Sequence, residues 1–194
     1  MMKAYLDNVI CSGIARCELD PPAEMNATRA LLSARDHGVL ILVTSAESWR
    51  EQEKTVDPQM RATLAKGREP VPRVAHDYTV LGFNFSTDQL GGFRNDPLIT
   101  DIVDDLLFRQ LRIGVGLAEA DARHVMYAVY NGCCRFVTLD TNDLLPKKAQ
   151  VEAVCTRLKL VTPTELASEL GLPSIATLQR LAKALGVPVT ELLT

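Results

Sequence analysis

Short apolar runs alternate with amphipathic segments along most of the chain. The run at residues 39–43 is continuous and aliphatic, a pattern typical of a parallel strand buried on both faces. A short apolar strand is expected at residues 3–10, where Asp-Asn interrupts the apolar run. Between these runs, residues 23–37 place apolar side chains on one face of a helix that ends at Gly38. This alternation of strands and helices is the order expected of an α/β sheet.

The rest of the chain continues the alternation, with one irregular stretch. Residues 54–96 are rich in proline and glycine and carry several aromatic residues. After it, we expect helices over residues 97–111, 121–131 and 147–157 and a helix starting at Pro163, and strands over residues 113–115, 136–139 and 158–161. The sequence therefore predicts a three-layer α/β/α sandwich with a central parallel sheet over residues 1–170. A short helical tail is expected over residues 171–194.

Composition narrows the class of protein. The 194 residues are 47% hydrophobic and 23% charged, which is enough to bury a core. A net charge of −3 argues against nucleic-acid binding by bulk attraction, although a cluster of metal-binding carboxylates would itself lower the net charge. Five cysteines without a CxxC pair indicate no disulfide framework and favour a reducing compartment. No run reaches the roughly 18 apolar residues of a membrane span, so we expect a cytoplasmic protein with no membrane partner.

Four acidic residues lie at the edges of apolar segments and carry the functional argument: Asp7, Glu51, Asp121 and Asp140. Carboxylates that a fold brings together repel one another unless a cation intervenes. Oxygen ligands of this kind suit Mg²⁺ or Mn²⁺, and such ions support phosphodiester hydrolysis. We therefore expect one divalent-metal site, which a parallel sheet would place beyond the carboxyl ends of its strands.

Four patches in order, residues 5–10, 44–51, 120–128 and 137–143, resemble the PIN domain. That family includes the toxin ribonucleases of bacterial toxin–antitoxin pairs and several RNA-processing enzymes. The resemblance implies a PIN-like fold, a metal-dependent endoribonuclease activity and an RNA substrate. It also implies an antitoxin protein as a possible partner and a homodimer as the expected assembly.

The resemblance and the chemistry together assign roles to these residues. Asp7, Asp121 and Asp140 are expected to ligate the metal, and Glu51 to hold a ligand water or the attacking water. Four further polar residues are candidates for supporting positions near the site: Ser45, Thr138, Asn142 and Asp143.

Each assignment has a structural alternative. Asp7 could end its strand in a turn, Glu51 could be a solvated helix charge, and Asp121 could be a helix N-cap. Asp140 could close an ordinary Asx turn. His124 lies one helical turn from Asp121 and could face the site, or could be an exposed or internally bonded helix histidine.

A local basic run in the irregular stretch is a candidate RNA-binding lip: Arg61, Lys66, Arg68 and Arg73. Aromatic side chains nearby could stack on bases. The alternatives are a solvated loop or a groove for a partner helix. The tail resembles the end of a helix-turn-helix domain without its recognition helix, which favours a docking or dimerisation role over DNA reading.

Two other functions compete with the nuclease interpretation. The first is a non-catalytic PIN-like module that binds RNA or a regulatory partner. The second is a phosphoryl-transfer domain of the receiver or haloacid-dehalogenase kind. The dehalogenase pattern requires Asp-x-Asp, but residue 9 is Val.

Overall fold

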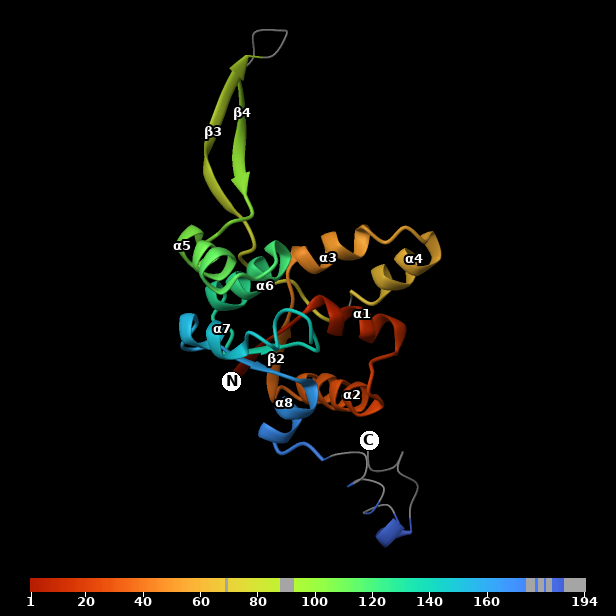
Figure 1. Ribbon diagram of the computed structural model, residues 1–194. Helices are drawn as coiled ribbons and strands as arrows, with labels where there is room; N and C mark the ends of the chain where they lie inside the picture. The colour runs from red at the N-terminus through yellow and green to blue at the C-terminus, as the bar shows by residue number, and fades with distance from the viewer. Residues whose placement is uncertain (69, 88–92, 174–176, 178–179, 181–182, 187–194) are drawn as a thin grey trace.

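A four-stranded parallel sheet lies at the centre of the computed structural model (Figure 1). The structure describes residues 1–68, 70–87, 93–173, 177, 180 and 183–186, and only the backbone of residues 81–87 and 93–98. The strands of the sheet are β1 (Met2–Leu6), β2 (Leu40–Val43), β5 (Arg135–Val137) and β6 (Lys159–Val161). Their order is β2-β1-β5-β6, and each neighbouring pair is parallel. The predicted mixed α/β class with a central parallel sheet is thus confirmed.

Helices cover both faces of this sheet, as a three-layer arrangement requires. One face packs against α1 (Asn8–Arg16), α2 (Pro22–Asp36) and α8 (Pro163–Glu169). The other face packs against α5 (Asp105–Arg109), the π-helix η1 (Gln110–Val115), α6 (Glu119–Tyr130) and α7 (Lys148–Val154). Two further helices, α3 (Ala46–Glu53) and α4 (Pro58–Lys66), pack against α1.

The alternation of side chains along β1 explains how one strand serves both faces. Ala4 and Leu6 pack with the α1, α2 and α8 layer, whereas Tyr5 packs with the α6 layer. All three side chains are essentially inaccessible to solvent. A central strand of a parallel sheet is apolar on both faces for this reason.

The expected strand over residues 3–10 is too long. Strand β1 ends at Leu6, because Asp7 is the N-cap residue of α1. Its carboxylate accepts a hydrogen bond from the backbone N–H of Asn8 (2.7 Å). Helix α1, in which Ile10, Cys11 and Ile14 form the buried stripe, was not predicted. The predicted helix at residues 23–37 and the strand at residues 39–43 agree with α2 and β2 to within one residue at each end.

The expected helix over residues 97–111 is wrong for its first half. Residues Phe93–Thr100 form β4, which pairs antiparallel with β3 (Thr79–Thr87) in a two-stranded hairpin that projects from the body (Figure 1). The helix begins only after Asp104, whose carboxylate accepts the backbone N–H of Leu107 (3.0 Å). The expected strand at residues 113–115 is also wrong, because that segment belongs to η1, which ends at Gly116 with φ of +77°.

The later elements follow the prediction more closely. The helices at residues 121–131 and 147–157 correspond to α6 and α7, and the strands at residues 136–139 and 158–161 to β5 and β6, with shifted ends. The helix expected from Pro163 is α8. Thr162 and Glu165 form a reciprocal capping box at its N-terminus.

The predicted helical tail lies largely outside the described residues. Among its described positions, Thr177, Arg180 and residues 183–185 have helical backbone.

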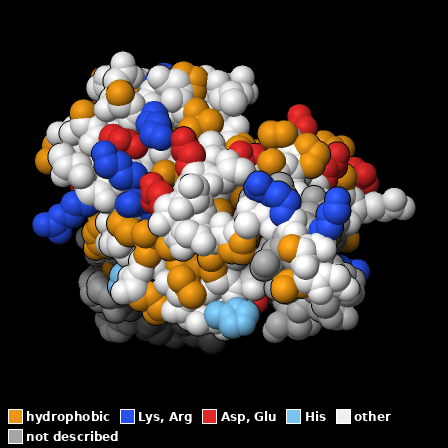
Figure 2. All heavy atoms as spheres, turned by 90° about the horizontal axis from the view of Figure 1, so that it is seen from below, with side chains coloured by type: hydrophobic (Ala, Val, Ile, Leu, Met, Phe, Trp, Pro, Cys, Tyr) orange, Lys and Arg blue, Asp and Glu red, His pale blue; other side chains and the backbone are white. Residues whose placement is uncertain are grey.

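None of the described helices is long and apolar enough to cross a membrane. The five cysteines are free thiols. On the face opposite the hairpin, acidic and basic side chains lie beside hydrophobic ones (Figure 2), as on a solvated surface.

Candidate functional site

The topology singles out one place in the molecule for a ligand. In the strand order, β2 lies next to β1 on one side, whereas β5 and β6 lie on its other side. In open parallel sheets, ligands bind beyond the carboxyl ends of the strands at such a change of direction. Asp7 directly follows β1, and Asp140 lies three residues beyond the end of β5. Two of the expected carboxylates therefore stand at this crevice.

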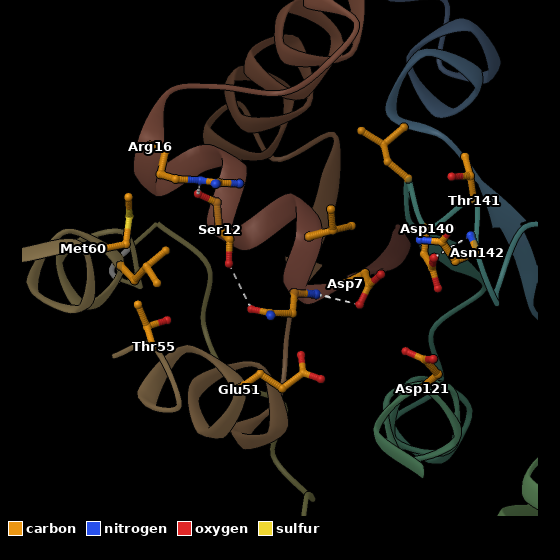
Figure 3. Close-up of a pocket in the computed structure, with 14 residues that line it drawn as sticks. Asp7, Ser12, Arg16, Glu51, Thr55, Met60, Asp121, Asp140, Thr141 and Asn142 are labelled. Atoms are coloured by element: carbon orange, nitrogen blue, oxygen red, sulfur yellow. Dashed lines mark hydrogen bonds between the residues drawn. The ribbon is translucent and has the colours of Figure 1, made fainter. Parts of the chain in front are cut away.

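A pocket of about 610 Å³ opens at the same place. Asp7, Glu51, Asp121 and Asp140 all line it, so four segments far apart in the sequence contribute one carboxylate each. In the close-up of Figure 3, Asp121 and Asp140 lie on one side of Asp7, and Glu51 lies below it. The structure thus brings together all four acids that the sequence singled out.

Asp7 is the most buried of the four acids, with 5% of its surface exposed. Its Oδ2 accepts a hydrogen bond from the hydroxyl of Thr138 (2.6 Å), and its Oδ1 accepts the backbone N–H of Asn8. Burial raises the pKa of Asp7, although the hydrogen bonds and the nearby His124 oppose the rise. The carboxylate is therefore oriented by the protein and is costly to keep charged.

Asp140 combines a structural role with its place in the pocket. Its Oδ1 accepts the backbone N–H groups of Asn142 (2.8 Å) and Asp143 (3.3 Å), and its Oδ2 accepts that of Leu144 (3.2 Å). The Asx-turn alternative is therefore correct as a description of its local contacts. Thr138 also accepts the backbone N–H of Asp140 (3.0 Å), so a single hydroxyl ties Asp7 to the turn that presents Asp140.

Asp121 lies in the first turn of α6, but Ala118 is the N-cap residue, so the N-cap alternative for Asp121 is wrong. Burial, the charge of Asp7 and contacts with Asp143 and Asp140 raise the pKa of Asp121 to about 7. This shift records the electrostatic cost of placing several carboxylates in one pocket.

Asp143 caps a helix and does not line the pocket. Its Oδ2 accepts the backbone N–H of Ala118 (2.6 Å) at the start of α6, and Lys147 pairs with its other oxygen. Burial alone would raise the pKa of Asp143, but the contacts with Lys147 and Ala118 outweigh it and lower the pKa. Asp143 therefore places a charge at the start of α6, and its side chain is also hydrogen-bonded to Asp121, which lines the pocket.

A chain of hydrogen bonds between buried side chains leads from Glu51 into the core. Its Oε2 is hydrogen-bonded to Nε2 of His124 (3.3 Å), and Nδ1 of His124 is hydrogen-bonded to the hydroxyl of Tyr5 (2.6 Å). The same hydroxyl contacts the Oγ of Ser45 (2.6 Å). Tyr5, Ser45 and His124 are each 0% exposed.

Ser45 and His124, two of the polar residues considered near the site, both lie in this chain of contacts. Ser45 caps α3 by accepting the backbone N–H of Glu47 (3.3 Å), and as a fully buried side chain it is out of reach of a substrate in the pocket. Burial lowers the pKa of His124, but the hydrogen bond to Glu51 and the charges of Asp7, Glu51 and Glu47 outweigh it and raise the pKa. His124 therefore lies between Tyr5 in the core and Glu51 at the pocket, with both ring nitrogens in hydrogen bonds.

The proposed basic lip does not form at the pocket. Arg73 forms an ion pair with buried Asp77 (2.8 Å), and both Arg68 and Arg73 stack on the ring of Trp49. Arg61 and Lys66 are exposed on α4, and among the described residues neither they nor the other two arginines line the pocket.

The basic residue that does line the pocket is Arg16, in the last turn of α1. Arg16 was not a candidate in the sequence, because α1 was not predicted. Asn8 and Ser12, which line the pocket from the same helix, were missed for the same reason. A helical period of apolar residues through Ile10 and Ile14 was the signal available in the sequence.

The carboxylates line the same pocket but do not converge on a single point. Within the described ranges, no three His, Cys, Asp or Glu side chains lie close enough together to enclose an ion. In the same part of the chain, Asp7, Asp121 and Asp140 have no ion pair with a lysine or arginine. No described lysine or arginine side chain therefore neutralises these three carboxylates.

No family model, curated protein or solved structure matches this chain in comparisons with known proteins. The site is therefore interpreted from its own residues.

Proposed function

We propose that this protein is a Mg²⁺- or Mn²⁺-dependent endoribonuclease with a PIN-like fold. The observation that supports the proposal most is that four carboxylates from four separate elements line one pocket at the carboxyl ends of β1 and β5. RNA as the substrate comes from the resemblance of four sequence patches to the PIN domain. The chemistry of the pocket would serve any phosphodiester.

The donor set of the pocket fits a hard divalent cation. Asp7, Asp121 and Asp140 would hold it, directly or through its waters, because their oxygens have no ion pair with a described lysine or arginine and burial raises the pKa of Asp7 and of Asp121. Mg²⁺ keeps several of its waters and needs few direct protein ligands, so an open arrangement of carboxylates suits it. When bound, such an ion neutralises charge on phosphate oxygens and makes water more acidic.

The protein's own groups would orient the reaction. Glu51 uses Oε2 for His124, which leaves Oε1 free to accept a proton from a water in the pocket. His124 cannot rotate away, since its other nitrogen is engaged by Tyr5. Thr138 holds Asp7 in one orientation. These contacts pre-organise the acids before substrate arrives.

The test is cleavage of a labelled single-stranded RNA by the purified protein with Mn²⁺, with Mg²⁺ and with EDTA. We expect metal-dependent cleavage, reduced about 100-fold or more by Asp121→Asn. The matched control is Asp105→Asn, which changes an exposed aspartate on α5 and should leave the rate unchanged.

Two results would overturn the proposal. Full cleavage by Asp121→Asn would place the chemistry elsewhere. RNA binding that is insensitive to EDTA, with no cleavage under any metal condition, would identify a non-catalytic binding module.

A further inference from the structure

The pocket has two ends of opposite chemical character. The acidic end carries the four carboxylates. The other end is formed by α1 and by the chain from Thr55 through α4, and we call it the Arg16 subsite: Ser12, Arg16, Thr55, Met60 and Leu64. Figure 3 shows Ser12, Arg16, Thr55 and Met60 on the side of Asp7 away from Asp121 and Asp140.

Helix α1 connects the two ends and sets their spacing. Asp7 is its N-cap, and Arg16 is its last residue. The Nε of Arg16 donates to the backbone carbonyl of Ser12 (3.3 Å), so the side chain folds back along the helix toward the acidic end. At about 1.5 Å of rise per residue, Ser12 lies about 7.5 Å along the helix axis from Asp7. An extended ligand with two anionic groups could therefore reach both ends.

The guanidinium of Arg16 remains available to an anion. Arg16 is exposed, and it forms no ion pair with a described acidic side chain. Its Nη atoms make no hydrogen bond within the described part of the chain, which leaves the planar fork that suits phosphate oxygens. Next to it, the hydroxyl of Ser12 donates to Oδ1 of Asn8 (3.2 Å), so polar groups continue from Arg16 toward Asp7.

The wall opposite α1 is less polar. Met60 is 36% exposed, and Leu64 is buried beneath it. A flexible thioether on a partly exposed helix face suits packing against a sugar or a base of variable shape. One end of the pocket thus offers a cation and an apolar wall side by side, which is what a nucleotide requires.

We propose that the Arg16 subsite binds the nucleotide adjacent to the scissile phosphodiester, with its phosphate on Arg16 and its sugar or base against Met60. This inference rests on the proposed function for the position of the scissile bond. It replaces the basic run of residues 61–73 as the place where the protein meets the nucleic-acid backbone. It also assigns a substrate requirement, because a substrate without the adjacent phosphate would lose the contact with Arg16.

A basic residue in the last turn of a helix also stabilises the helix dipole, so the test has to separate binding from folding. The full chain is titrated with a labelled single-stranded RNA by fluorescence anisotropy, with Ca²⁺ in place of Mg²⁺, over a series of salt concentrations. Arg16→Ala is compared with Arg61→Ala, which removes an exposed arginine outside the pocket. Thermal unfolding of each variant is recorded alongside.

We expect Arg16→Ala to weaken RNA binding about 10-fold, the value of a hydrogen-bonded charge pair. The slope of log affinity against log salt concentration should become shallower by about 0.7, the change for one lost phosphate contact on a single strand. Met60→Ala should weaken binding without changing that slope. Arg61→Ala should change neither quantity.

The outcomes distinguish this inference from the proposed function. Wild-type affinity and salt slope in Arg16→Ala would overturn the subsite, even if the protein cleaves RNA. A lowered unfolding temperature with an unchanged slope would do the same, and would assign Arg16 to the helix dipole alone. Loss of affinity and slope in a protein that never cleaves RNA would support the phosphate contact and reject the nuclease.

Discussion

The two faces of the sheet are equally buried, yet they differ in chemistry. On the face covered by α1, α2 and α8, the side chains of β1 and β2 are aliphatic, as Leu6, Leu40 and Leu42 show. On the face covered by α6, Tyr5 stacks on Phe136 (5.1 Å between ring centroids) and also hydrogen-bonds to His124 and Ser45. Both faces contain a hydrophobic core, and the face under α6 also carries a line of polar contacts from Tyr5 to Glu51 at the pocket. We call this face the polar face and the other the apolar face.

The difference shows what the buried polar groups do. A buried hydroxyl or imidazole costs free energy unless it is paired, and an apolar residue of similar shape is often no worse for stability. Tyr5 and His124 are paired, and their chain of contacts ends on Glu51. We therefore expect the polar contacts to position Glu51 and the apolar packing to stabilise the fold.

The largest effect on stability should come from the apolar face. Leu42→Ala removes a side chain that is 1% exposed and should lower the free energy of unfolding by about 2–5 kcal/mol. Urea unfolding measures this change. Val39→Ala, at a position 48% exposed, is the control and should have little effect. The cleavage rate per folded molecule should stay unchanged in Leu42→Ala, and a specific loss of rate would remove the distinction between the two faces.

The polar face should show the reverse pattern. His124→Gln keeps a polar side chain in the core but removes the fixed contact between Tyr5 and Glu51. We expect kcat to fall about 10- to 100-fold, a range seen when groups that orient a site are removed, and KM for RNA to stay near its wild-type value. Tyr5→Phe leaves the ring stacked on Phe136 and should reduce kcat less. If His124→Gln lost stability but kept its kcat, His124 would be a core residue only.

A third difference should appear in the pH dependence of the free energy of unfolding of the metal-free protein. The pKa of Asp121 is raised from 3.8 to about 7 in the folded state. Between these pH values the folded protein binds more protons than the unfolded chain at this group, so the free energy of unfolding falls as pH rises through the window. Thermal unfolding in EDTA from pH 5 to pH 8 should show this fall, and Asp121→Asn should reduce it.

The comparison of wild type with Asp121→Asn is needed because His124 acts with the same sign. Its pKa is also raised, so its contribution is present at low pH and is lost as pH rises. Identical pH dependence in the two proteins would mean that Asp121 has no raised pKa. Adding Mn²⁺ at pH 8 should raise the unfolding temperature of the wild type more than that of Asp121→Asn.

Sequence reasoning succeeded where periodicity is local and strong. The aliphatic run of β2 and the amphipathic α2 were predicted to within one residue at each end, because burial on two faces or on one leaves a direct trace in the sequence. It failed at residues 97–111, where Ile99 and Leu107 match a helical period but Ile99 belongs to a strand. The partner of Ile99 in the sheet is Val80 of β3, 19 residues earlier, and local spacing cannot report such pairing.

The chain alone determined that four carboxylates follow or flank buried elements, and that their order suits a metal site. Only the folded structure decided which polar residues support them. His124 and Tyr5 are 119 positions apart, and Asp7 and Thr138 are 131 apart, yet each pair is in hydrogen-bond contact. The physical reason is that a strand is visible in the sequence as an apolar run, so an acidic residue at its end can be recognised locally. The residues that hydrogen-bond to these acids come close to them only when β1, β5 and α6 pack together.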